Sequence, residues 1–174
     1  ARAIAAYRNN KVEQSLSMMD SLITLEPNNP YFQELKGQML VDYGRVREAL
    51  PYYEQAVKTR PKDALIRTAY AHAQIETAGN DEVQLNKAIK NLERAQLDES
   101  RSPRLQRLLA TAHGRLGHEA EAQLHLAEEA LLQNRREEAK ALAERAQKGL
   151  AENSRPWIRA QDILNYIEQN KESN

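Results

Sequence analysis

Four histidines are the side chains of this sequence best suited to chemistry: His72, His113, His118 and His125. Imidazole nitrogens bind zinc, and the zinc-peptidase pattern His-Glu-x-x-His places two of them one helical turn apart. His118 and Glu119 begin such a pattern in "HEAEA", but the position that needs the second histidine is occupied by Ala122. The pattern lacks a ligand, and we therefore expect no metal site and no cofactor in this chain.

No other catalytic pattern is present in the sequence. It contains no glycine-rich phosphate loop and no nucleophile elbow, and its carboxylates follow helix faces as in "RREEAK". Charges three and four residues apart stabilise a helix and face solvent. We therefore expect this chain not to be an enzyme.

The charge balance and the lack of cysteine restrict the class of partner. Lys plus Arg equal Asp plus Glu at 25 each, so no overall field attracts nucleic acid. Without cysteine there is neither a disulfide framework nor a thiolate metal site. No apolar run approaches the roughly 20 residues that span a bilayer. We expect neither nucleic-acid binding nor a membrane span.

The elements that would position any functional side chain are helices. Ala, Leu, Glu, Gln, Lys and Arg dominate the composition, and these residues favour helix. The first stretch, "ARAIAAYRNN", is already helical in pattern and has no capping residue before it. We therefore expect an all-α chain that is a segment of a longer protein.

The helices repeat with a fixed period. Pro27 and Pro61 end two similar segments, "SLITLEPNNP" and "QAVKTRPKDA", one period of 34 residues apart. Between them the sequence has small or packing residues at regular places: Gly37, Leu40, Gly44, Ala49, Tyr53 and Ala56. Small residues let two antiparallel helices approach closely, and a glycine closes the turn between them. This spacing resembles the tetratricopeptide repeat.

The pattern predicts a right-handed α-solenoid of about five tetratricopeptide-like hairpins, forming a single array over residues 1–174. The expected units are about 1–29, 30–63, 64–102, 103–135 and 136–174, the last with a capping helix over 155–170. After Gly117 two phases fit, because Ala122 and Leu126 agree with one and Ala127, Ala139 and other alanines with another. Which helices line the inner face there stays open. Pro51 lies early in a helix expected to begin near residue 46 or 47, with its ring toward solvent.

A groove lined by the first helix of each hairpin is the expected binding surface for a protein or peptide. The second unit would contribute Tyr31, Glu34, Gln38, Val41 and Asp42. The third unit would contribute Leu65, Thr68, His72, Ile75 and Glu76. Modules that clamp the acidic C-terminus of heat-shock chaperones use Lys and Asn at such places, so the acidic and amide residues here disfavour that kind of clamp.

Four arginines form a second candidate surface, a basic patch on and before the helix that follows Pro103: Arg101, Arg104, Arg107 and Arg115. Guanidinium groups pair well with the carboxylates of a partner. The alternative is a solvated helix face, because long arginine side chains commonly just cover helix surfaces.

Beyond the generic repeat, the sequence resembles the C-terminal tetratricopeptide region of bacterial periplasmic zinc metallopeptidases of the BepA type. The most telling segments are "GRLG" at 114–117, "LAEEALL" at 126–132 and "WIRAQDIL" at 157–164, and the similarity extends upstream through "ARAIAAYRNNKVEQSLSMMDSLI". The resemblance implies an HExxH peptidase domain upstream, which would hold the zinc, and a periplasmic location.

The resemblance also implies a role in quality control of outer-membrane proteins. The repeat would dock client chains or partners, among them the upstream peptidase domain and the outer-membrane assembly machinery. One alternative is a structural role in which the repeat packs on the peptidase domain and gates it. A more distant alternative is a stand-alone cytoplasmic scaffold of the same repeat class.

Overall fold

A computed structural model describes residues 2–170, and that range consists of helices joined by short turns. The helices are α1 (Arg2–Arg8), α2 (Val12–Leu25), α3 (Pro30–Asp42), α4 (Val46–Thr59), α5 (Ala64–Ala78), α6 (Glu82–Gln96), α7 (Pro103–Arg115), α8 (Glu119–Leu132), α9 (Arg136–Gly149) and α10 (Arg155–Gln169). No strand occurs within residues 2–170, and the all-α fold is confirmed.

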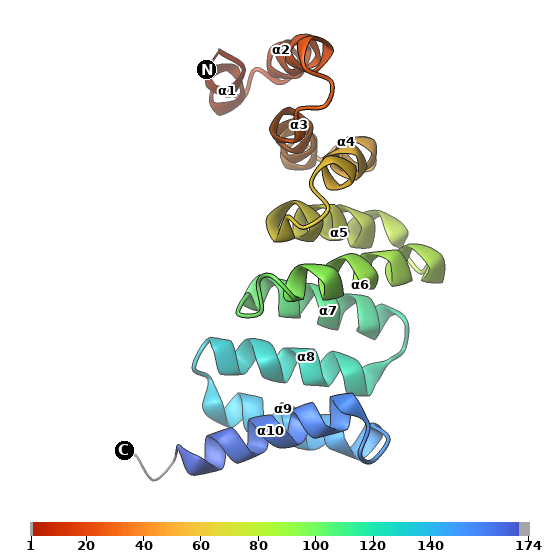
Figure 1. Ribbon diagram of the computed structural model, residues 1–174, viewed down its shortest axis with the longest axis vertical. Coiled ribbons are helices and arrows are strands. Elements are labelled where there is room, and N and C mark those ends of the chain that lie inside the picture. The colour runs from red at the N-terminus through yellow and green to blue at the C-terminus, as the bar shows by residue number, and fades with distance from the viewer. Residues whose placement is uncertain (1, 171–174) are drawn as a thin grey trace.

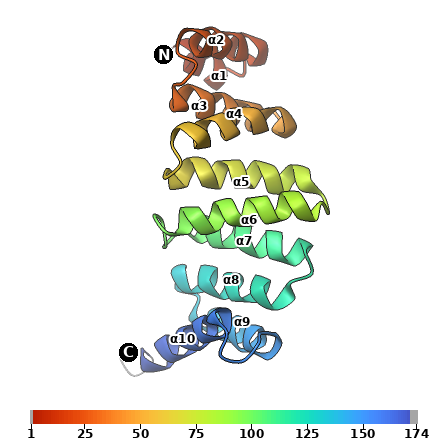
Figure 2. The ribbon, with the colours of Figure 1, turned by 45° about the vertical axis from the view of Figure 1, so that its right-hand side comes forward.

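The helices stack in chain order along one long axis, from α1 at one end to α10 at the other (Figures 1 and 2). Each helix packs against the next, and direct contacts also join α3 to α5 and α5 to α7. Neighbouring elements in the sequence are therefore neighbours in space, as in a solenoid of helical hairpins.

The small residues of the repeat lie where helices approach most closely. A Cβ atom added to Gly37 would lie 3.0 Å from the ring of Tyr53, which is 1% exposed. Ala49 and Ala56, on the same helix as Tyr53, are completely buried. The glycine on α3 thus makes room for the tyrosine on α4, and this explains why the spacing of these residues predicts the hairpin.

A residue with positive φ lies in the turn after α1, α3, α5, α7, α8 and α9, and these residues are Asn10, Gly44, Gly79, Gly117, Asn134 and Asn153. In four of these turns the next backbone N–H donates to a carbonyl five residues back, as in the bond from Arg45 to Leu40 at 2.7 Å. The others join Lys11 to Ala6, His118 to His113 and Arg135 to Ala130. This arrangement satisfies carbonyl groups at the end of a helix.

A side chain caps the first turn of five helices, four of which begin after a turn between hairpins, while the fifth is α6, capped by Asp81. Asn29, Asp63, Ser102 and Ser154 each accept a hydrogen bond from a backbone N–H at the start of α3, α5, α7 and α10. Such caps satisfy N–H groups that have no partner within the helix. The cap of α10 is thus of the type found on α3, α5 and α7, although α6 shows that a second helix can also have one.

Helix α8 begins like a second helix of a hairpin and ends like a first helix. It begins, like α2 and α4, after an uncapped turn, and it ends at Asn134 in the same type of turn that closes α1, α3 and α7. It packs against both α7 and α9, and it also contacts α10 directly. α8 is therefore the second helix of one hairpin and the first helix of the next. The two phases that the sequence left open are both present, and they overlap at this helix.

The buried side chains follow this shift in phase. One apolar cluster joins α1 to α5, a second joins α5 to α7, and a third joins α8 to α10. Between the second and third clusters lies a polar pair, Gln106 of α7 and His125 of α8, whose Oε1 and Nδ1 atoms are 2.9 Å apart. The apolar core is thus divided at the seam between α7 and α8.

Replacing Ala127 by leucine tests this packing. Ala127 is fully buried in the third cluster, together with Ala139 and Ala146 of α9. Extra methylene groups there must push α8 away from α9, so we expect Ala127→Leu to lower the free energy of unfolding by about 1–3 kcal/mol. Urea unfolding measures the loss. Ala5→Leu, at an exposed site of α1, is the control, and equal effects of both variants would contradict the close packing of α8 on α9.

Pro51 lies inside α4 with its ring exposed, and α4 begins at Val46, both as expected from the sequence. It is nevertheless past the first turn, so its missing N–H removes a bond to the carbonyl of Arg47. We expect Pro51→Ala to raise the free energy of unfolding by about 1 kcal/mol, since the loss of unfolded-state restriction offsets part of the gain. A lower midpoint of urea unfolding would mean that the ring itself stabilises the fold.

Candidate partner-binding surface

The residues predicted on α3 lie on its surface but have contacts within the chain. Tyr31 is 57% exposed, and its hydroxyl accepts a hydrogen bond of 2.6 Å from Arg60, whose guanidinium also lies over the tyrosine ring. Glu34 is half-buried, and burial, with a smaller contribution from Asp63, raises the pKa of its carboxyl group. Tyr31 and Glu34 are both accessible at the beginning of the helix.

At the other end of α3, Asp42 accepts hydrogen bonds from Tyr7 and from the amide of Gln38, the latter at 2.7 Å. The bond to Asp42 is the main cause that raises the pKa of Tyr7 to about 12, so the phenol stays neutral. Val41 packs against the first apolar cluster. At this end of the predicted groove, the neutral side chains of Tyr7 and Gln38 both donate hydrogen bonds to the carboxylate of Asp42. The bond from Tyr7 joins α1 to α3.

On α5 the predicted residues divide into exposed and buried groups. Leu65 is 67% exposed, and His72 lies 3.3 Å from Glu76 along the helix surface. Thr68 and Ile75 are buried, and the hydroxyl of Thr68 donates to the carbonyl of Ala64. The two buried side chains have no surface to offer a partner in this conformation. The reason for Ile75 is that it belongs to the apolar cluster formed with residues of α6 and α7.

The predicted basic patch does not form one continuous stripe. Arg107 donates to the buried carboxylate of Glu129 on α8, at 2.9 Å from Nε, and Arg115 donates to the backbone carbonyl of Ile75. Both therefore join helices of this chain. Arg101 and Arg104 are exposed, and neither forms an ion pair with a carboxylate among the described residues.

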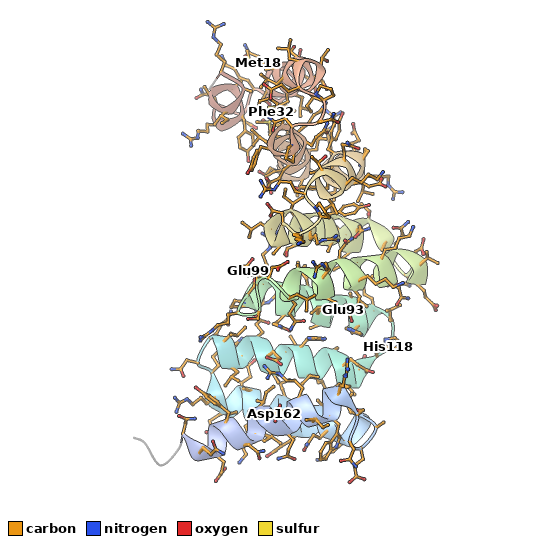
Figure 3. The ribbon with its side chains drawn as sticks, in the orientation of Figure 1. Met18, Phe32, Glu93, Glu99, His118 and Asp162 are labelled. Atoms are coloured by element: carbon orange, nitrogen blue, oxygen red, sulfur yellow. The ribbon has the colours of Figure 1, made fainter. Side chains whose placement is uncertain are left out.

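A pocket lies farther along the array, between α8, α10 and the loop that connects α6 to α7. Its volume is about 620 Å³. Figure 3 labels Asp162 on α10 and Glu99 in the α6–α7 loop, the two elements that border the pocket together with α8. Arg101 is the one predicted site residue that lines it.

An ion pair between α8 and α10 forms part of the pocket lining. Arg159 of α10 binds the carboxylate of Glu128 with two nitrogens, one of them at 2.9 Å, and the side chain of Glu128 is only 9% exposed. This hydrogen bond is the main cause that raises the pKa of Arg159. A two-pronged pair of this kind fixes geometry as well as charge. It holds α8 against α10 at the pocket.

Further pocket residues come from α8, α9 and α10. Arg136, the first residue of α9, donates to the backbone carbonyl of Asn170 at 3.2 Å. Tyr166 of α10 is 50% exposed, Leu131 is half-buried, and the buried Ile163 lies at the pocket lining. Sequence reasoning missed these residues because no motif links them. The sequence signal that could have indicated them is Asn134. It lies in the turn after α8, at the place that glycine occupies in the turns after α3 and α7.

Three histidines gather at the seam between α7 and α8, with His118 labelled at the turn in Figure 3. The rings of His113 and His125 stack with centroids 5.3 Å apart, and the Nδ1 atoms of His113 and His118 are 3.4 Å apart. Burial lowers the pKa of His113, and burial together with His113 lowers that of His125 to about 3. The imidazoles of His113 and His125 are therefore packing groups that favour the neutral form.

Within residues 2–170, no group of three or more His, Cys, Asp or Glu side chains is arranged to hold a metal ion. Over the same described residues, no helix has both the length and the apolar character to cross a bilayer.

Comparison with known families identifies the class of protein. The family model described as "Tetratricopeptide repeat" matches residues 3–146, which is most of the chain. The chain therefore belongs to the tetratricopeptide-repeat family, whose repeats generally mediate protein–protein interaction without catalysis. No curated protein sequence matches the chain.

Several solved structures are similar to this chain in fold. A crystal structure of MamA has a TM-score of 0.72 at 13% identity, covering 99% of this chain and 96% of that one. A second, "MamA MSR-1 C2", has a TM-score of 0.67 at 19% identity, covering 76% and 74%. A tetratricopeptide-repeat protein of Thermus thermophilus has a TM-score of 0.54 at 18% identity, covering 94% and 95%. At these identities the likeness concerns the fold alone.

Proposed function

We propose that this chain is a docking module that binds partner proteins on two surfaces. The first is the face of α3 and α5, where Tyr31, Glu34 and Leu65 are accessible. The second is the pocket between α8 and α10. The observation that carries the proposal is this pocket of about 620 Å³, because it joins exposed arginine, tyrosine and aliphatic side chains in one concavity.

The module serves, in this proposal, a bacterial periplasmic zinc metallopeptidase of the BepA type. The support is the sequence similarity at 114–117, 126–132 and 157–164. The peptidase domain would lie upstream and hold the zinc, and the repeat would bring client chains or the outer-membrane assembly machinery to it. A periplasmic location belongs to the same proposal.

A regulatory role is the second candidate, in which the array packs on the peptidase domain and gates it. The observation that favours it is an apolar pocket of about 410 Å³ at the start of the array, lined by Ala3, Met18 and Leu22 among others. Ile4 and Leu25 are also exposed on this first hairpin. Apolar surface at the end of a solenoid suits a neighbouring domain.

Two measurements distinguish docking from gating. The first is binding of unfolded outer-membrane protein by the isolated chain, and the second is basal proteolysis by the full-length protein with Tyr31→Ala and Glu34→Lys. Docking predicts that the isolated chain binds and that basal proteolysis is unchanged. Gating predicts the reverse. A cytoplasmic scaffold would be indicated if the natural protein contained no peptidase domain at all.

The isolated chain should neither cleave protein nor bind zinc tightly, because the only His-Glu pattern lacks its second histidine. Titration with zinc, followed by calorimetry, measures this directly. A saturable stoichiometric site in the isolated chain would contradict the proposal that zinc belongs to another domain.

A further inference from the structure

We propose that the pocket between α8 and α10 binds an extended segment of a partner that has an Asp or Glu beside a bulky apolar side chain. This inference rests on the proposed docking function and specifies the partner of one of its surfaces. It follows from three properties of the pocket: its place in the fold, its charge and its apolar wall.

The place of the pocket follows from the overlap of the two repeat phases. Up to α7 the first helices of the hairpins are the odd-numbered ones, and they contact one another from α3 to α7. From α8 onward the corresponding contact joins α8 to α10. The array therefore has a second face lined by first helices, and the pocket lies on that face. A partner bound there need not compete with one bound on α3 and α5.

The charge of the pocket favours an acidic partner. Its lining includes three arginines and two carboxylates, but Glu128 is neutralised by the two-pronged bond from Arg159. The remaining charged side chains of the lining are one carboxylate, Asp162, and two arginines, Arg101 and Arg136. One nitrogen of Arg136 donates a hydrogen bond to the carbonyl of Asn170. Arg101 forms no ion pair with a carboxylate of the described chain. An incoming carboxylate can therefore bind Arg101 without displacing a partner.

The apolar wall favours a large side chain next to that carboxylate. Tyr166 exposes half of its surface at the pocket, and its hydroxyl forms no hydrogen bond with another described residue. Leu131 and Leu132 of α8 are half-buried, and Ile163 of α10 lies beneath them. Aromatic and arginine side chains at a concave site are the groups that contribute most to protein binding.

An array of nine-residue peptides that vary in charge and apolar content tests the proposal, with the labelled chain as the probe. We expect the chain to select peptides with Asp or Glu beside Leu, Ile or Phe. Arg101→Glu should weaken binding of the selected peptides about tenfold, as expected for loss of one charge-assisted hydrogen bond, and should shift selection toward Lys and Arg. Tyr166→Ala should weaken binding by about fivefold or more.

The matched control is Arg145→Glu, an exposed arginine of α9 outside the pocket, which makes the same change of charge. It should leave selection and affinity unchanged. Circular dichroism of each variant verifies that the helices are intact, and both Arg101 and Tyr166 are exposed enough for that to be expected.

The possible results separate this inference from the proposed function. Selection of basic or uncharged peptides, or binding that is insensitive to Arg101→Glu and Tyr166→Ala, overturns the pocket assignment. If binding is instead abolished by Tyr31→Ala and Leu65→Ala, the docking function stands on the α3 and α5 face alone. If no peptide binds at all, both the pocket assignment and the docking of extended segments are wrong.

Discussion

Replacing Tyr53 by alanine is expected to lower the free energy of unfolding by about 3–5 kcal/mol, the range for removal of a buried aromatic ring. Tyr53 is 1% exposed and lies against Gly37, which has no side chain of its own to fill the space that the ring would leave. Burial is the main cause that raises the pKa of its phenol, so the group stays neutral at all ordinary pH values. Urea unfolding followed by far-UV circular dichroism measures the loss.

Two controls separate packing from other effects. Tyr53→Phe keeps the ring, and since no hydrogen bond joins the Tyr53 hydroxyl to another described residue, we expect a change below about 1 kcal/mol. Tyr31→Ala removes an equally large but exposed ring and should cost far less. A small effect of Tyr53→Ala would mean that α3 and α4 do not depend on this contact.

The second large effect is a loss of stability in acid caused by His125. Its pKa falls to about 3 in the fold through burial and the proximity of His113. The unfolded chain has an ordinary histidine pKa of about 6.5, so between these values the unfolded state binds more protons and stability decreases as the pH falls. Between about pH 7 and pH 4 we expect a loss on the order of 2–3 kcal/mol from this residue.

The direction of this effect can be verified with a variant. His125→Gln removes the imidazole whose pKa is lowered to about 3 at the seam of α7 and α8, so the free energy of unfolding of the variant should depend less steeply on pH in the same window. The comparison is made by urea unfolding at several pH values. Parallel pH profiles for the two proteins would show that His125 is solvated and titrates normally.

The sequence predicted the hairpins well, for a physical reason that is visible at single residues. Gly37, Ala49 and Ala56 are small because two helices meet there, and Gly44 has a positive φ because the chain reverses there. These requirements concern residues close together in the sequence, and the same residue types recur in successive repeats. The spacing therefore contains enough information to predict the all-α array without any long-range contact.

The change of phase at α8 was harder to predict, because one helix satisfies both patterns. Ala122 faces α7 while Ala127 is buried against α9 and α10, so either phase finds its small residues. The turn at Asn134 has positive φ, a conformation in which asparagine is less expected than glycine. The contacts between α8 and α10 show that the second phase applies from α8 onward. These contacts depend on how α8, α9 and α10 pack together.

The pocket could not be predicted from the sequence, and the basic patch illustrates why. Four arginines near one another in the sequence suggested one surface, yet Arg107 and Arg115 bind groups of this chain. Arg101 instead lies with Arg136, Arg159 and Tyr166, which follow 35 or more residues later. A surface made by side chains from separate helices has no linear motif.

Hydrogen exchange of the chain with and without a selected acidic and apolar peptide tests the central claim most directly. If the pocket is the docking site, the peptide should slow exchange in the α6–α7 loop, at the end of α8 and in the part of α10 from Arg159 to Tyr166. Exchange in α3 and α5 should not change. Slower exchange confined to α3 and α5, or no change anywhere at saturating peptide, would contradict it.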